Sequence, residues 1–139
     1  MLKLKNYLLC KNLVKCELTR NASTSYSFTK VITQKDVAVY AELTGDTNPV
    51  HFQGDKSIVH GTYLLGLVSS IMGTKCPGPG TKVLELSSKF LKPCPVGSEV
   101  EVLVLIADAR KISQSNFLVT LNSNKNHVFV EGTAKLLTR

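Results

Sequence analysis

The window GDTNPVH at 45–51 is where side chains with catalytic potential are crowded together in this 139-residue chain. It places Asp46 and His51 five residues apart across an Asn48-Pro49 turn. Pro49 fixes its own φ and disfavours helical geometry at Asn48, so the turn is stiff. A stiff turn can hold a carboxylate and an imidazole toward one small group, as acid–base chemistry requires. Asp and Asn are also ordinary turn residues after a helix-ending glycine, so the window alone leaves both interpretations open.

A second motif, IVHG at 58–61, leads directly into an apolar stretch with helical character. Free N–H groups at a helix start attract negative charge, and Gly61 lets a substrate approach the backbone closely. The alternative is that His60 caps or packs at the helix start and that Gly61 is a spacer. Asp46, His51 and His60 could also be metal ligands, but their spacing matches no common metal site, so we expect no metal here.

The elements around these motifs predict one α+β domain. A short strand over 26–32 is followed by a helix whose start is marked by Thr33 and Asp36, as in a capping box, and whose end is marked by Gly45. The stretch 63–72 is apolar nearly all round and predicts a helix that the rest of the protein must cover.

After the sequence CPGPG, only strands are expected, at 81–91, 99–111, 115–122 and 127–137, with a hairpin turn at 123–126. One sheet must then wrap one apolar helix. Two glycines, Gly61 and Gly66, lower the helix propensity of that apolar stretch, which predicts close backbone approach at both.

The net charge of +7 is concentrated at the N-terminus, where residues 1–30 contain six basic side chains and one acidic one. The remainder has a net charge of only +2, which does not indicate a nucleic-acid-binding body. No apolar run approaches the ~18 residues of a membrane-spanning helix. The basic, acid-poor opening predicts a mitochondrial targeting segment over 1–25, with a frayed helix or a disordered tail as alternatives. The four cysteines show neither metal spacing nor a dense disulfide framework, so we expect ordinary thiols, with a disulfide as the alternative.

Residues 40–51, YAELTGDTNPVH, followed by IVHG at 58–61, resemble the signature of the MaoC-like family of (3R)-specific enoyl-thioester hydratases and dehydratases. The continuation GTKCPGPG at 73–80 and the basic leader look most like the mitochondrial hydroxyacyl-thioester dehydratase type 2 group. This resemblance implies a hot-dog fold over 26–139, with an antiparallel sheet wrapped around a long central helix.

The resemblance further implies that Asp46 and His51 are catalytic, binding the water or leaving hydroxyl at the β-carbon of the thioester. It implies substrate-binding roles for Asn48, for His60 and for the backbone N–H of Gly61 as an oxyanion site. No cofactor is expected. The implied partners are an acyl carrier protein or a CoA thioester and a second copy of the chain in a homodimer, and the implied location is the mitochondrial matrix.

Three functions remain open from the sequence. The first is a (3R)-3-hydroxyacyl-thioester dehydratase of mitochondrial type II fatty-acid synthesis, and the second is a (3R)-specific enoyl-CoA hydratase of fatty-acid oxidation. The third is a non-catalytic thioester-binding hot-dog protein, because the segment 52–57 between the two motifs is shorter than the family pattern and has Gln53 where an acid is usual.

Overall fold

The computed structural model describes residues 24–106 and 111–138. Most of the predicted targeting segment 1–25, and the end of the strand predicted over 99–111, lie outside these residues. The elements follow the predicted order. They are β1 (Thr24–Val31), α2 (Gln34–Thr44), two short 3-10 turns, η1 (Pro49–His51) and η2 (Gly54–Lys56), α3 (Gly61–Thr74), β2 (Lys82–Phe90), β3 (Glu99–Ile106), β4 (Ile112–Leu121) and β5 (Asn124–Leu137).

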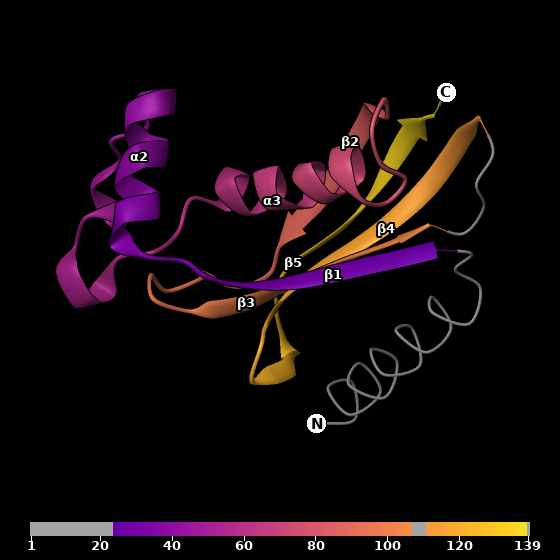
Figure 1. Cartoon of the computed structure of the whole chain (residues 1–139). Coiled ribbons are helices and arrows are strands. Elements are labelled where there is room, and N and C mark those ends of the chain that lie inside the picture. The colour runs from indigo at the N-terminus through magenta and orange to yellow at the C-terminus, as the bar shows by residue number, and fades with distance from the viewer. Residues whose placement is uncertain (1–23, 107–110, 139) are drawn as a thin grey trace.

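The five strands form one antiparallel sheet in the order β1-β3-β4-β5-β2, and α3 lies across one of its faces (Figure 1). The predicted α+β arrangement is confirmed. In β3, the side chains of Val100, Val102 and Val104 are fully buried and join those of Phe117 and Val130 in a common core with α3. Burial alternates from Glu99 to Val104 because successive strand side chains point to opposite faces, and the last residues of β3 are buried on both faces.

The helix α2 begins and ends at the predicted residues. The Asp36 N–H bonds the Thr33 hydroxyl, and the Asp36 carboxylate accepts from the Thr33 N–H at 2.8 Å, which completes a capping box. That backbone hydrogen bond, with a smaller contribution from Lys30, lowers the pKa of the Asp36 carboxyl. The cap therefore stabilises the fold above the ordinary pKa of aspartate and weakens as pH falls through the lowered value. Gly45 ends the helix at φ 78°, a left-handed conformation that suits glycine.

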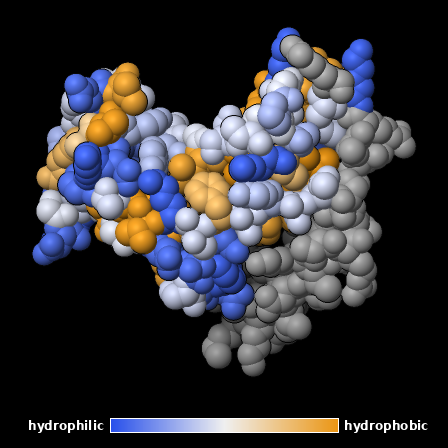
Figure 2. All heavy atoms as spheres, in the orientation of Figure 1, coloured by the Kyte–Doolittle hydropathy of each residue, from blue (hydrophilic) through white to orange (hydrophobic). Residues whose placement is uncertain are grey.

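The helix α3 buries one side on the sheet through Leu64, Val68, Ile71 and Met72. Its other side is less covered than the all-apolar pattern predicts, since Leu65 and Leu67 are only half-buried. Figure 2 shows hydrophobic side chains at the surface between the α2 and β2 ends of the molecule, where α3 lies in Figure 1. In the described part of the chain, no helix has the length and hydropathy needed to cross a membrane.

The structure also differs from the sequence prediction in the second half of the sheet, where the strand predicted over 115–122 is β4 (Ile112–Leu121). The β4–β5 turn is Asn122-Ser123, so β5 begins at 124 rather than 127, and the pairing shifts register after Val119. This irregularity interrupts the alternation on which the strand prediction depended. The expected close approach at Gly66 is also wrong, because an added Cβ there would meet nothing within 4 Å.

Gly66 and Gly132 should therefore respond in opposite directions to substitution by alanine. Gly66→Ala should stabilise the protein by about 0.5–1 kcal/mol through higher helix propensity. Gly132→Ala should destabilise it by about 1–3 kcal/mol, because the methyl group would overlap the Ser87 carbonyl oxygen and the Phe117 ring. Denaturant unfolding of both variants measures this difference, and a Gly132→Ala protein as stable as the parent would contradict it.

Candidate active site

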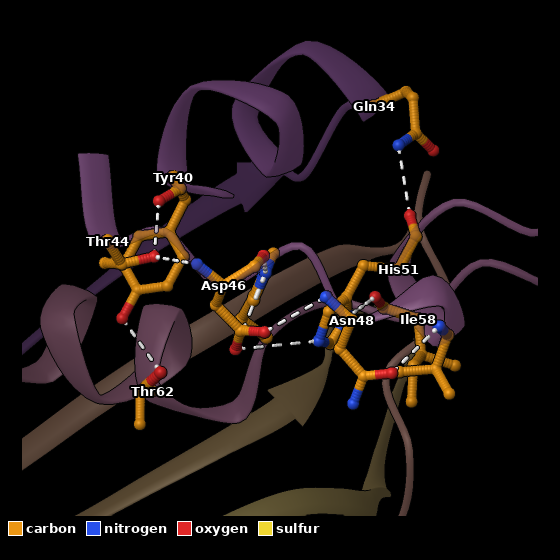
Figure 3. A network of polar contacts seen from close by, with 10 residues as sticks. Gln34, Tyr40, Thr44, Asp46, Asn48, His51, Ile58 and Thr62 are labelled. Atoms are coloured by element: carbon orange, nitrogen blue, oxygen red, sulfur yellow. Dashed lines mark hydrogen bonds and ion pairs between the residues drawn. The ribbon is translucent and has the colours of Figure 1, made fainter. Parts of the chain in front are cut away.

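The turn after α2 is held by a series of short-range hydrogen bonds (Figure 3). The Asp46 N–H donates to the Thr44 hydroxyl at 3.3 Å, and the Asp46 carboxylate accepts from the Asn48 N–H at 3.2 Å. The Asn48 side-chain oxygen in turn accepts from the Val50 N–H at 3.3 Å. The Asn48 side chain thus stabilises the turn that carries the Asp46 carboxylate.

His51 ends the 3-10 turn η1, and two contacts hold it in place. The Gln34 side chain, at the start of α2, donates to the His51 carbonyl at 3.2 Å. The His51 Nδ1 lies 2.7 Å from the Ile58 carbonyl oxygen. Because a carbonyl oxygen only accepts, Nδ1 carries the proton, and Nε2 of the neutral ring is left as an acceptor.

The bare Nε2 of His51 lies 4.0 Å from Oδ2 of Asp46. This separation is too long for a direct hydrogen bond, but it allows both atoms to bond one water oxygen at about 2.8 Å. The His51 side chain is 9% exposed and that of Asp46 is 46% exposed, so the pair has a buried member and a member open to solvent. An acceptor pair of this kind can bind a water molecule or a hydroxyl group, take a proton from it and give the proton back.

A hollow of about 290 Å³ brings Asp46, His51 and Gly61 together, with His60, Thr62 and Phe90 as its other walls. The short connection 52–57 therefore does not separate the two motifs. Gly61 is the first residue of α3, and its N–H has no backbone acceptor among the described residues. The ring of Phe90 lies so close that an added Cβ on Gly61 would sit 2.5 Å from it. A free donor at the helix start suits a developing negative charge.

A second hollow of about 240 Å³ shares His51, Gly61 and Phe90 with the first and is otherwise mostly apolar. Cys94 is one of its lining residues and is buried. Burial raises the pKa of the Cys94 thiol to about 11, so this sulfur is protonated near neutral pH and is a poor nucleophile. The chemistry of the site is therefore that of the carboxylate–imidazole pair.

His60 joins the site from the buried side. Its side chain is 1% exposed, and its Nε2 lies 3.1 Å from the Asp46 carbonyl oxygen. Asp46, His51 and His60 have potential ligand atoms within 4.8 Å of one another. Because the carbonyl contact requires a proton on Nε2 of His60, that nitrogen has no lone pair for a metal. The donor set therefore does not fit a three-ligand metal site in this arrangement.

The amino-acid sequence also matches a known protein family. A model of the MaoC like domain matches residues 17–127, which is most of the chain. The chain belongs to the MaoC-like family. Relatives of this chain are named hydratases and dehydratases, which confirms the hydro-lyase class expected from the sequence motifs.

Three relatives show the range of this family. A 3-hydroxybutyryl-CoA dehydratase of Methylorubrum extorquens is 38% identical over 87 residues, which are 57% of this chain and 55% of that protein, so this match spans about half of it. An (R)-specific enoyl-CoA hydratase of Rhodospirillum rubrum is 30% identical over 81% of this chain and 84% of its own. A mitochondrial 3-hydroxyacyl-[acyl-carrier-protein] dehydratase of Arabidopsis thaliana is 28% identical over 76% of this chain and 70% of its own.

Among solved structures, the (R)-hydratase of A. caviae involved in PHA biosynthesis superposes with a TM-score of 0.77 at 27% identity. The match covers 85% of this MaoC-like chain and 96% of that structure, which confirms the hot-dog fold.

The site also contains residues that the sequence did not single out. Phe90 comes from β2, and the Ile58 carbonyl that fixes His51 is a backbone group, which no residue type signals.

Proposed function

We propose that this MaoC-like protein is a (3R)-3-hydroxyacyl-thioester dehydratase that also catalyses the reverse hydration of trans-2-enoyl thioesters. The observation that carries the proposal is the 4.0 Å separation of Asp46 Oδ2 from His51 Nε2, in a hollow that also contains the backbone of Gly61. This reaction needs two proton acceptors that hold a water molecule and a donor for the thioester oxyanion, all within one small hollow.

In the hydration direction, Asp46 and His51 hold a water molecule at the β-carbon of the enoyl thioester. The water oxygen forms a bond to that carbon while one of its protons passes to the pair. The electrons of the carbon–carbon double bond move toward the thioester carbonyl, whose developing charge the Gly61 N–H stabilises. The pair then delivers that proton to the α-carbon on the same face, so the water adds as a hydroxyl group and a proton. Dehydration is the reverse, and every atom of the water is accounted for.

The carrier of the acyl group divides the proposal into two forms. The Arabidopsis relative is named as a mitochondrial acyl-carrier-protein dehydratase, which supports a role in mitochondrial type II fatty-acid synthesis. Relatives named for CoA substrates support an enoyl-CoA hydratase of fatty-acid oxidation equally well. The basic opening of the chain favours the mitochondrial matrix. A fluorescent fusion of the full chain would test this location, and a cytosolic signal would refute it.

The test of the function is hydration of crotonyl-CoA, followed by loss of enoyl absorbance, with the stereochemistry of the product determined. The same measurement on crotonyl thioesters of an acyl carrier protein separates the two forms. A (3R) product supports the proposal, and a strong preference for CoA moves it to the oxidation form. Binding of enoyl thioesters by folded protein without turnover on either substrate would instead establish a non-catalytic thioester-binding protein.

We also propose that the protein is a homodimer that pairs through β2. This strand is an edge of the sheet and pairs with β5 on one side only. Four exposed large hydrophobic side chains lie on it, against two on β1 at the other edge. On β2 they are Val83, Leu84, Leu86 and Phe90. An unpaired, apolar edge strand is a template for a second chain. The helix α3 contacts both β2 and β3, and its side turned away from the sheet is only half-covered.

The proposed dimer predicts that Leu86→Lys shifts the protein from dimer to monomer at micromolar concentration, because a charge would be buried in the pairing region. Leu43→Lys on α2 is the matched control, since Leu43 is more exposed but lies away from β2, and it should leave the mass unchanged. Sedimentation equilibrium measures both masses. A monomeric parent protein, or a Leu86→Lys variant that stays dimeric, would refute pairing through β2.

A further inference from the structure

The proposed reaction leaves His60 without a part in the chemistry, although it is the polar side chain packed most closely against the reacting pair. It is 1% exposed, so its ring is almost wholly buried behind the hollow that it helps to line. Its Nε2–H donates to the Asp46 carbonyl at 3.1 Å and lies 3.9 Å from the Asp46 carboxylate. One edge of the His60 ring is thus tied to the residue that carries the carboxylate.

The ring of His60 also stacks on the ring of His51. The two ring centroids are 3.6 Å apart, and the planes are inclined by 24°. Tyr40 packs on His60 with a centroid distance of 4.9 Å, and its hydroxyl bonds the Thr62 hydroxyl at 2.8 Å. His51 is therefore fixed at one edge by the Ile58 carbonyl and over one face by His60, and its Nε2 lies 4.0 Å from the Asp46 carboxylate.

The remaining nitrogen of His60, Nδ1, is buried and has no hydrogen-bond partner. An unpaired acceptor in the interior costs free energy, and a leucine or phenylalanine would avoid that cost. A core selected for packing alone does not explain a histidine here. The polar contact that this histidine does make is directed at Asp46, and its ring contact is directed at His51.

We propose that His60 is a positioning residue that aligns the reacting pair, holding the plane of the His51 ring by stacking and the Asp46 backbone by its Nε2–H. This inference rests on the proposed function for its consequence in turnover. Its structural content is the 3.6 Å stack and the 3.1 Å hydrogen bond. Displacement of a reacting group by about 1 Å can lower a rate about 100-fold, so loss of either contact affects kcat more than KM.

Two substitutions separate the two contacts. His60→Phe keeps a flat ring against His51 and removes the donor to Asp46, whereas His60→Gln keeps an N–H near the Nε2 position and removes the ring. We expect each variant to fold and to lower kcat for crotonyl-CoA hydration by about 10–100-fold, with KM changed by less than about 3-fold. The control is the same pair of changes at His127, which packs on Phe129 in β5 and should leave kcat unchanged.

A second measurement does not depend on turnover. In the parent protein, ¹⁵N chemical shifts of His51 should report a single tautomer with the proton on Nδ1, and in His60→Gln they should move toward a mixture of tautomers. Folded variants whose kcat stays within 2-fold of the parent value would overturn the positioning role, whether or not KM rises. A parent protein without turnover would refute the proposed function, while the His51 shifts would still decide whether His60 fixes that ring.

Discussion

Asp46→Asn and His51→Gln should each lower kcat for crotonyl-CoA hydration by about 10²–10⁴-fold. Asn keeps the shape of the Asp46 side chain and its contact with the Asn48 N–H but cannot take a proton from water. Gln at 51 removes the ring whose Nδ1–H is bonded to Ile58 and whose Nε2 faces the carboxylate at 4.0 Å. Steady-state hydration assays on the purified protein measure kcat for each variant.

The double variant Asp46→Asn/His51→Gln should be little slower than the worse single variant, because two residues that hold one water act as a unit. Asp55→Asn is the matched control: it removes an acid in η2, four residues after His51, and should leave kcat unchanged. Multiplicative losses in the double variant would show that the two side chains act on separate steps. Unchanged kcat in either single variant would remove that residue from the mechanism.

Several of the features predicted correctly from the sequence are determined by local hydrogen bonds. The capping box of α2 and the stop at Gly45 depend on residues within one or two turns of the chain. The stiff turn that carries Asp46 and His51 is held by bonds spanning two residues each, so the spacing in GDTNPVH was enough to predict it. The helix α3 could be predicted from its composition.

The features that the sequence did not predict depend on contacts between distant segments. Phe90 reaches the hollow because β2 is at the far edge of the sheet, next to β5 rather than to β3, and no periodicity encodes that order. The stack of His60 on His51 requires the chain to fold back after η2. The sequence predicted a close approach at both Gly61 and Gly66, and the position of Phe90 shows that it occurs only at Gly61.

That difference leads to the second large expected effect. Gly61→Ala should lower kcat/KM for hydration by about 10²–10³-fold, the loss expected when one oxyanion donor is removed. The new methyl group would lie 2.5 Å from Cε1 and 2.8 Å from Cδ1 of Phe90, so the ring has to move. Phe90 is 54% exposed, which allows that movement without unfolding, but the methyl group and the displaced ring then occupy the space beside the Gly61 N–H.

Gly66→Ala makes the same chemical change one and a half turns further along α3, where nothing lies within 4 Å of the added carbon, and should leave kcat/KM unchanged. The pair of variants therefore separates loss of the oxyanion site from a general effect of alanine on the helix. Phe90→Ala combined with Gly61→Ala identifies the cause. Recovery of most of the activity in the double variant would assign the loss to the displaced ring, and no recovery would assign it to the methyl group itself. Full activity of Gly61→Ala alone would move the oxyanion site to another donor, because a methyl group there could not coexist with a thioester carbonyl bonded to that N–H.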